Sequence, residues 1–393
     1  MTTYDADVVV VGLGALGSMT LWRLASRGVN VIGVEQFEIA HDLGSSHGST
    51  RLFRLACFEH PDLGSMALHA HELWRELEDV SGTELLTLTG GVMVGPRNSE
   101  LIVGTRQAAA NAGATVEELS SEDLAQRFPV FANTDPSYVG LWDPNAGVLR
   151  PEASITAAIN AAKAQGAQVL DRTKVTAISE TTDGVEVHTE GRVIRARSVV
   201  VAAGPWISKL LDLPHLTPMR TIMTWFRPTA GALDVDQLPV FIRHIDEQRT
   251  IWGHGGIDGL PIKVGAPDNE FNIRPTDPDT IDRELSDGDV AGARDVVRQY
   301  FHGIDPEPAD SYTCMITFSP DLQFVLGPRE PGSKVILAGG CSGHAFKHAS
   351  AIGDFLAGSA LGEPPSLRHQ FVSPERFLSP TQNTYTNQQK AEN

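Results

Sequence analysis

The stretch DADVVVVGLGALGS, residues 5–18, decides the fold of this chain. Its apolar run at 8–11 predicts a buried strand, and glycines at 12, 14 and 17 follow directly. Apolar positions that recur over residues 15–25 predict a helix, and Gly28 is placed to end it. A strand, a tight turn and a helix in this order are typical of the opening of a Rossmann-like unit in an α/β protein.

The three glycines of this turn have separate physical roles. Gly12 allows the tight turn, Gly14 lets the backbone approach a pyrophosphate, and Gly17 permits close packing of the helix on the strand. The helix N-terminus attracts the negative charge. A second strand at 29–34 ends in Glu35, where a carboxylate can accept hydrogen bonds from a ribose diol. The stretch therefore predicts an adenine dinucleotide site without distinguishing NAD from FAD.

Length and composition favour a two-domain protein and exclude several partners. A chain of 393 residues with 41% hydrophobic content can bury a large core. The net charge of -18 argues against nucleic acid and anionic membranes, which need clustered Lys and Arg. No apolar segment is long enough to span a membrane, and Asp5 and Asp7 stand where a signal peptide is basic. We therefore expect a cytoplasmic protein without nucleic-acid or membrane partners.

The cysteines and histidines do not indicate a metal site. Cys57, Cys314 and Cys341 form no CxxC pair, so neither a disulfide framework nor zinc is expected. The thirteen histidines include no HExxH pattern. An odd number of cysteines leaves at least one available for a chemical role.

The remaining pattern predicts two domains, with a chain that leaves the first domain twice and returns to it twice. Apolar strands at 199–203, followed by Gly204, and at 335–338 are expected to return to the first sheet, with Gly204 at the cofactor. Strand-like pieces such as TIMTWFRP and LPIKVGAP predict a second, mainly antiparallel sheet. We expect a dinucleotide-binding domain at 1–83, 150–210 and 316–376, a substrate domain at 84–149 and 211–315, and a mobile tail at 377–393.

Three motifs resemble those of a known family, the flavoprotein amine oxidases typified by monomeric sarcosine oxidase and N-methyltryptophan oxidase, within the D-amino acid oxidase fold group. The motifs are GSSHGSTRLFR at 44–54, TCMITFSPD at 313–321 and GCSGHAFK at 340–347. The resemblance spans nearly the whole chain. It implies FAD, a Rossmann-like FAD-binding domain, and oxidation of a small secondary amine beside a carboxylate. Hydride would pass to the flavin, O2 would become hydrogen peroxide, and the imine would be hydrolysed to an aldehyde and an amine.

The resemblance also implies roles for individual residues near the flavin. Cys314 would carry FAD through a thioether, and a small buried thiol is the alternative. Lys263 would promote the reaction of reduced flavin with oxygen by stabilising developing negative charge, whereas an exposed strand lysine is the alternative. Thr50 and Arg51 match positions against the flavin, with Arg51 counted as catalytic, although both could instead brace their loop.

Two further cations match those that hold the substrate carboxylate in the family. Arg54 can bind a carboxylate through two parallel N–H bonds, and Lys347 adds a point charge. Gly343 and His344 belong to the same stretch as Lys347 and are expected at the cofactor. The helix that begins there can direct its positive end at the flavin edge where negative charge gathers on reduction.

Three positions depart from the pattern of sarcosine oxidation. Trp252 and Ile316 stand where the family has tyrosines, and Pro267 stands where it has a histidine. Trp252 and Ile316, the expected substrate-binding residues, favour a more apolar substrate, unless both are ordinary core residues.

Several alternatives stay open on this scaffold. The chain could oxidise cyclic imino acids or fructosyl amino acids, or could be a dehydrogenase that passes electrons to another acceptor than oxygen. A tRNA-modifying or non-catalytic flavin-binding module is the alternative from another class. We expect a monomer or a small homo-oligomer.

Overall fold

The first sheet is built around β1 (Ala6–Val11), the strand that precedes the glycine turn. The computed structural model describes residues 3–213, 215–231, 233–246, 249–266, 273–365 and 368–378. Within these residues, β1 pairs in parallel with β2 (Val31–Val34) on one side and with β12 (Val193–Val201) on the other. The other five strands of this eight-stranded sheet are β9 (Gln168–Leu170), β10 (Val175–Glu180), β11 (Val185–Thr189), β19 (Val325–Pro328) and β20 (Val335–Gly339).

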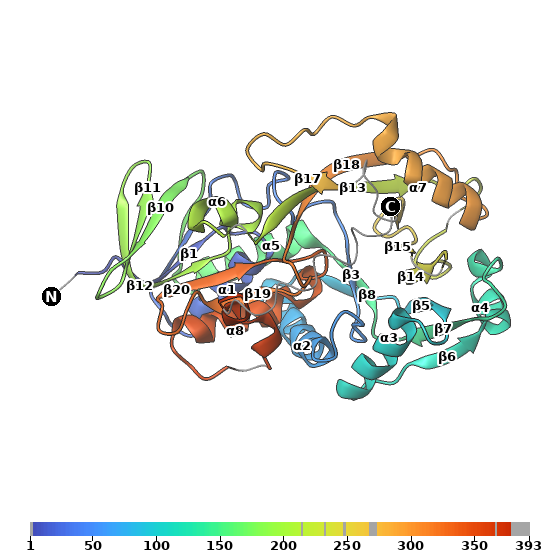
Figure 1. Cartoon of the computed structure of the whole chain (residues 1–393), viewed down its shortest axis with the longest axis horizontal. Coiled ribbons are helices and arrows are strands. Elements are labelled where there is room, and N and C mark those ends of the chain that lie inside the picture. The colour runs from blue at the N-terminus through green and yellow to red at the C-terminus, as the bar shows by residue number, and fades with distance from the viewer. Residues whose placement is uncertain are drawn as a thin grey trace.

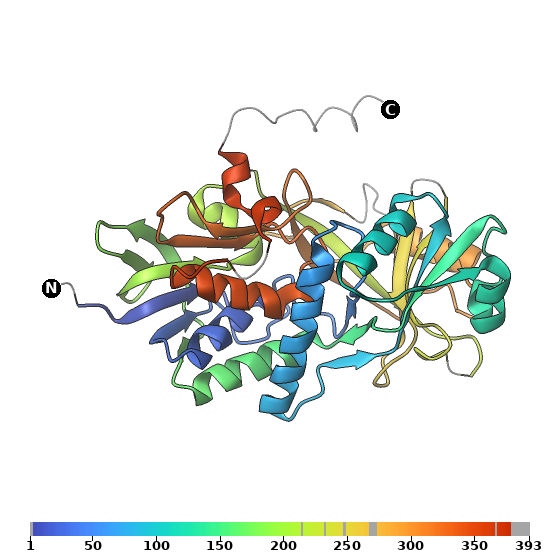
Figure 2. The ribbon, with the colours of Figure 1, turned by 90° about the horizontal axis from the view of Figure 1, so that it is seen from below.

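Both faces of the first sheet are covered. Val8 and Val10 of β1 belong to one buried cluster, and Val9 and Val11 belong to another, as the period of two in a strand requires. On the first side, α1 (Ala15–Ser26) and α8 (Ala349–Ala360) pack on the sheet, and α2 (Leu63–Ser81) and α5 (Pro151–Ala164) pack against these two helices (Figures 1 and 2). One short helix, α6 (Ile207–Leu211), lies on the second side.

The helix that follows the glycine turn, α1, is held tightly by α8. Gly353 of α8 lies against the backbone of α1, and a Cβ at this position would be 2.6 Å from Met19 Cβ. The side chains of Met19 and Trp22 on α1 are fully buried. This packing fixes the N-terminus of α1 relative to the sheet.

The second sheet has nine strands and is mainly antiparallel. Its longest pairing joins β13 (Thr217–Phe226) to β18 (Asp310–Phe318), and its parallel pair joins β14 (Val240–His244) to β5 (Gly91–Pro96). The other strands are β6 (Glu117–Ser120), β7 (Tyr138–Asp143), β15 (Thr250–His254), β16 (Ile262–Gly265) and β17 (Arg274–Pro275). Three helices accompany this half of the molecule (Figure 1): α3 (Glu100–Asn111), α4 (Ser121–Arg127) and α7 (Asp287–Tyr300).

A small three-stranded sheet lies between the two large ones (Figure 1). It consists of β3 (Arg51–Phe53), β4 (Leu86–Leu88) and β8 (Gly147–Leu149). Because β3 begins at Arg51, this sheet carries the predicted flavin and substrate residues at 50–54 into the region between the two large sheets. Short 3-10 helices complete the described structure: η1 (Pro129–Phe131), η2 (Gly204–Trp206), η3 (Phe346–His348), η4 (Gln370–Val372) and η5 (Pro374–Phe377).

Some element boundaries differ from those predicted. β2 begins at Val31 rather than at residue 29, because the Val29 N–H donates to Leu24 O in the turn that closes α1. The expected domain boundary between residues 315 and 316 divides β18, which pairs with β13 up to Phe318. Of the tail expected at 377–393, only the first two residues are described. No helix within the described ranges is long and apolar enough to cross a membrane.

Candidate active site

A continuous cavity of about 1030 Å³ is lined by residues of both large sheets. Every predicted site residue lines it except Gly17, which packs inside the glycine turn. One part of the wall contains the glycine turn and Glu35, and another contains Lys263, Cys314 and Lys347. This volume lies at the upper end of the range of ligand pockets, as expected for a large ligand such as a dinucleotide.

The glycine turn has the geometry that a pyrophosphate needs. Gly12 has φ +84°, and a Cβ there would be 2.5 Å from Ala202 O. A Cβ on Gly17 would be 1.8 Å from Gly12 O, so only glycine permits this packing of α1. At Gly14 the nearest atom to an added Cβ is Ser46 Oγ at 3.4 Å, which leaves this face of the turn open to the cavity.

Glu35 is a buried carboxylate that faces the same part of the cavity. Its Oε2 accepts from Leu13 N at 2.8 Å, and its Oε1 accepts from Phe37 N at 3.0 Å. Burial acts to raise the pKa of Glu35, but hydrogen bonds from His41, Leu13 and Phe37 outweigh burial and lower it. The group therefore stays ionised and rigid, as an acceptor for a ribose diol must be. The residues fit an adenine dinucleotide such as FAD.

The loop at 44–50 connects the glycine turn to the other end of the cavity. Ser46 Oγ accepts from Ala15 N at 3.2 Å. Glu152, in the first turn of α5, accepts from Gly48 N at 2.7 Å and from Ser49 N at 3.1 Å. The sequence prediction missed Glu152, whose only signal is an acidic residue next to a proline at a helix start.

Lys263 is buried behind this loop instead of being exposed on its strand. Its Nζ donates to Thr50 O at 3.0 Å and to Gly48 O at 3.3 Å, and lies 4.7 Å from the centre of the Trp225 ring. Burial lowers the pKa of Lys263 well below its usual range, and the charge of Arg51 acts in the same direction. A cation in such a site can stabilise negative charge that develops in the cavity.

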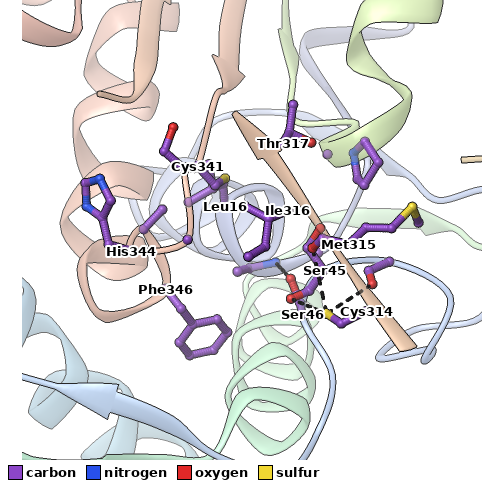
Figure 3. Close-up of a pocket in the computed structure, with 18 of the residues that line it drawn as sticks. Leu16, Ser45, Ser46, Cys314, Met315, Ile316, Thr317, Cys341, His344 and Phe346 are labelled. Atoms are coloured by element: carbon purple, nitrogen blue, oxygen red, sulfur yellow. Dashed lines mark hydrogen bonds between the residues drawn. The ribbon is translucent and has the colours of Figure 1, made fainter. Parts of the chain in front are cut away.

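Arg51 and Cys314 lie together at the wall formed by the 44–50 loop. Arg51 donates to Thr50 O at 2.8 Å and to Ser45 O at 2.9 Å. The sulfur of Cys314 lies 3.9 Å from Ser45 O, as Figure 3 shows. Burial raises the pKa of the Cys314 thiol, and the charge of Arg51 partly opposes this effect. Cys314 is therefore a buried residue of the cavity wall.

The two predicted carboxylate-binding cations do meet, and a third residue lies between them. Arg54 Nη2 and Lys347 Nζ contact the same oxygen of Glu59, at 2.5 Å and 3.2 Å. Burial acts to raise the pKa of Glu59, but Arg54 and Lys347 hold it well below its usual range. Two buried N–H-bearing atoms of Arg54, Nε and Nη1, have no hydrogen-bond partner among the described residues. The cluster therefore retains one net positive charge and free donors.

Glu59 was missed by the sequence prediction. It follows Arg54 by five positions in an irregular segment, where no periodic signal marks it.

The GCSGHAFK stretch closes the cavity on the side opposite Cys314 (Figure 3). His344 Nε2 contacts Leu322 O at 2.9 Å, so the ring donates to a carbonyl. Burial lowers the pKa of His344 to about 4, which leaves the ring neutral. Gly343 and Gly204 have φ of +82° and +51°, and both line the cavity. The predicted helix begins as η3 and continues as α8.

Trp252 and Ile316 are cavity residues as well as packing residues. Trp252 lies across the strand pair from Gly265, where a Cβ would be 2.1 Å from the indole. Ile316 extends from β18 between Cys314 and His344 (Figure 3). Ile242 and Phe58, which the sequence prediction missed, add apolar surface. Pro267 lies outside the described residues.

Comparisons with known proteins agree with this geometry. Residues 7–358 match the family DAO, FAD dependent oxidoreductase. The monomeric sarcosine oxidase of Streptomyces avermitilis is 34% identical over 361 residues, which cover 90% of this chain and 93% of that protein. The N-methyl-L-tryptophan oxidase of Yersinia pestis is 28% identical over 374 residues, covering 95% and 100%. The solved structure of NikD, an unusual amino acid oxidase essential for nikkomycin biosynthesis, superimposes with a TM-score of 0.81 at 25% identity, covering 95% and 98%.

Proposed function

This chain belongs to the DAO family of FAD-dependent oxidoreductases, and from that membership we propose an oxidase of secondary amines that bear a carboxylate, such as N-methyl amino acids. Relatives named sarcosine oxidase and N-methyl-L-tryptophan oxidase support this reaction class. FAD, when bound, supplies the hydride acceptor and passes the two electrons to O2. Water would hydrolyse the imine product, giving an aldehyde and an amine when the oxidised carbon is an N-methyl group.

The observation that carries the proposal is that one cavity joins the glycine turn to a buried pair of cations. Gly12, Gly14 and Glu35 would hold the pyrophosphate and ribose of FAD. Arg54 and Lys347, which both line the cavity, would hold the substrate carboxylate. A carboxylate fixed in this way orients the neighbouring amine and carbon, which is how binding lowers the barrier of the chemical step.

The wall beside these cations favours a substrate with an apolar side chain. Trp252, Ile316 and Ile242 border this part of the cavity, and Trp252 packs with Met93 of β5. Burying one aliphatic or aromatic side chain contributes about 1.5–3 kcal/mol. We therefore propose a larger N-methyl amino acid as a better substrate than sarcosine.

We also propose that Cys314 carries the flavin through a thioether. Its place at the cavity wall, beside Arg51 and the 44–50 loop, supports this role. Acid precipitation of the purified protein should leave the yellow colour in the pellet, and Cys314→Ala should release it to the supernatant. Complete release from the unaltered protein would contradict the covalent link.

The remaining parts of the proposal concern location and assembly. We propose a cytoplasmic protein, and the net charge of -18, which disfavours binding to anionic membranes, supports this location. We propose a monomer or a small homo-oligomer.

The test is anaerobic reduction of the flavin. The purified protein would be mixed with sarcosine, larger N-methyl amino acids, pipecolate, proline and fructosyl amino acids while the flavin band is followed, and air would then be admitted. Bleaching by N-methyl amino acids, with rapid recovery in air, is expected. If only pipecolate and proline, or only fructosyl amino acids, bleached the flavin, that class would replace N-methyl amino acids as the proposed substrate. Bleaching without recovery in air would replace the oxidase by a dehydrogenase.

A further inference from the structure

A buried imidazole, His254, lies directly behind the contact between Thr50 and Lys263. It is the last residue of β15 and is fully inaccessible to solvent. Its Nε2 is 2.9 Å from Thr50 Oγ1, and its Nδ1 is 2.6 Å from Gly255 O. Lys263 Nζ lies 3.4 Å from the same threonine hydroxyl. His254, Thr50 and Lys263 therefore form one row of hydrogen bonds, in that order, which ends at the Lys263 side chain in the cavity wall.

We propose that His254 is a positioning residue that fixes the direction of the Thr50 hydroxyl and thereby keeps Lys263 protonated in its buried site. This proposal rests on the oxidase function in one respect only, which is that the reaction of reduced flavin with oxygen uses the charge of Lys263.

The direction of each hydrogen bond in the row follows from the groups themselves. Gly255 O can only accept, so Nδ1 of His254 carries the proton. Burial lowers the pKa of His254 to about 4, so the ring is neutral and its Nε2 has a free lone pair. Nε2 must accept, and the Thr50 hydroxyl must donate to it. The lone pairs of that hydroxyl then remain for Lys263.

This orientation distinguishes the two protonation states of Lys263. An ammonium group can donate to the hydroxyl oxygen and to the carbonyls of Gly48 and Thr50, whereas a neutral amine would need a donor for its lone pair. Because the Thr50 proton is committed to His254, the hydroxyl cannot act as that donor. His254 thus opposes the loss of the ammonium charge that burial favours.

The other groups that face Lys263 come from different elements. Arg51 of β3 disfavours the ammonium and Glu152 of α5 favours it, while Cys314 of β18 is uncharged both as a buried thiol and as the thioether proposed above. None of these three groups makes a hydrogen bond with Thr50 Oγ1 that is comparable to that of His254 among the described residues. The threonine hydroxyl is therefore the route by which His254 acts.

The first experiment measures the tautomer in the intact flavoprotein by nitrogen NMR of labelled histidine, with the His254 signals assigned by their loss in His254→Gln. The expected result is a neutral ring protonated at Nδ1 at neutral pH. A ring protonated at Nε2 or at both nitrogens would overturn the proposal. This measurement needs neither substrate nor oxygen, so it decides the proposal even if the oxidase function fails.

The second experiment reduces the flavin with light and mixes it with oxygen over a range of pH. His254→Phe removes the acceptor and should slow reoxidation at pH 8 by about tenfold, the effect of one hydrogen bond. The pH at which the rate falls should shift downward, because the ammonium is less favoured. His254→Gln can place an amide oxygen near Thr50 and should restore most of the rate.

The control is His244→Phe, because His244 is buried in the neighbouring strand and also contacts a backbone carbonyl, Asp246 O, but does not line the cavity. It should reoxidise like the unaltered protein. In a Thr50→Val background, His254→Phe should cause no further loss of rate. If His254→Phe and His254→Gln lost the same fraction of the reoxidation rate, or if the pH profile of that rate did not shift, His254 would have a packing role only. Slow reoxidation of the unaltered protein would instead contradict the oxidase function.

Discussion

Glu59 changes what the substrate encounters in the cavity. With its carboxylate between Arg54 and Lys347, the cluster offers one net positive charge rather than two. All three residues are largely shielded from solvent, so these charges are weakly screened. Glu59 therefore stabilises the two cations and weakens their attraction for any other carboxylate.

Glu59→Gln should strengthen the binding of carboxylates. The amide keeps the shape of the side chain but removes the competing charge, so the Kd of a non-reducing carboxylate such as benzoate should fall by about tenfold. Perturbation of the flavin spectrum on titration measures the Kd. Glu118→Gln is the matched control, because Glu118 also lies between two arginines, Arg97 and Arg106, but at the surface. An unchanged or weaker affinity in Glu59→Gln would contradict this account.

Lys263→Met should separate the two half-reactions. The side chain keeps its length and loses its charge, so reoxidation of the flavin by oxygen should slow by about a hundredfold or more, while reduction by substrate changes little. Rapid mixing measures each step. Lys163→Met, on the exposed side of α5, serves as the control. Equal effects of Lys263→Met on both steps would remove its assigned role.

The buried His254 should make the protein sensitive to mild acid. Its pKa is about 4 in the folded protein against an ordinary value of 6.5, so the unfolded chain binds the proton first. The corresponding stability is fully present above pH 6.5 and is lost as the pH falls towards 4, by up to about 3 kcal/mol. The urea midpoint should therefore fall less between pH 6.5 and 4.5 in His254→Gln than in the unaltered protein. Parallel slopes would mean that His254 is protonated in the fold.

The contact between α1 and α8 is where helix packing supports the cofactor site. Gly353→Ala should lower the thermal stability and the FAD content of the purified protein, because the added Cβ would meet the α1 backbone at Met19. Overpacking of this kind costs about 1–3 kcal/mol, which exceeds the gain in helix propensity of about 1 kcal/mol. Thermal unfolding followed by flavin fluorescence measures both effects. Gly191→Ala, with nothing within 4 Å of the added Cβ, should change neither.

At the scale of helices and strands, the sequence predicted single elements better than it predicted which strands pair with each other. The helix predicted over residues 15–25 is α1, which spans Ala15–Ser26, because the glycine turn before it and Gly28 after it mark its ends in the sequence. The parallel pairing of β5 with β14 joins residues about 150 positions apart and leaves no local pattern. The same limit applies to the site, where motifs identified Arg54 and Lys347 but not Glu59 or His254, which lie outside any repeated spacing.

The whole molecule is strongly acidic, yet several basic side chains line its cavity. The net charge is -18, yet Arg51, Arg54, Lys263 and Lys347 all line one cavity. These basic side chains favour the binding of an anionic group beside them. The family resemblance indicated the cations in the sequence, whereas their burial follows only from the way the two sheets meet.

The order of strands in the first sheet has a consequence for biosynthesis. β1 pairs with β12, and β12 pairs with β20, whose last residue is Gly339. On the ribosome, the glycine turn emerges first but must wait for nearly the whole chain before its sheet is complete. Such late closure of distant contacts slows folding and leaves edges exposed meanwhile. FAD can therefore meet a completed first sheet only late in synthesis, after β20 has been made.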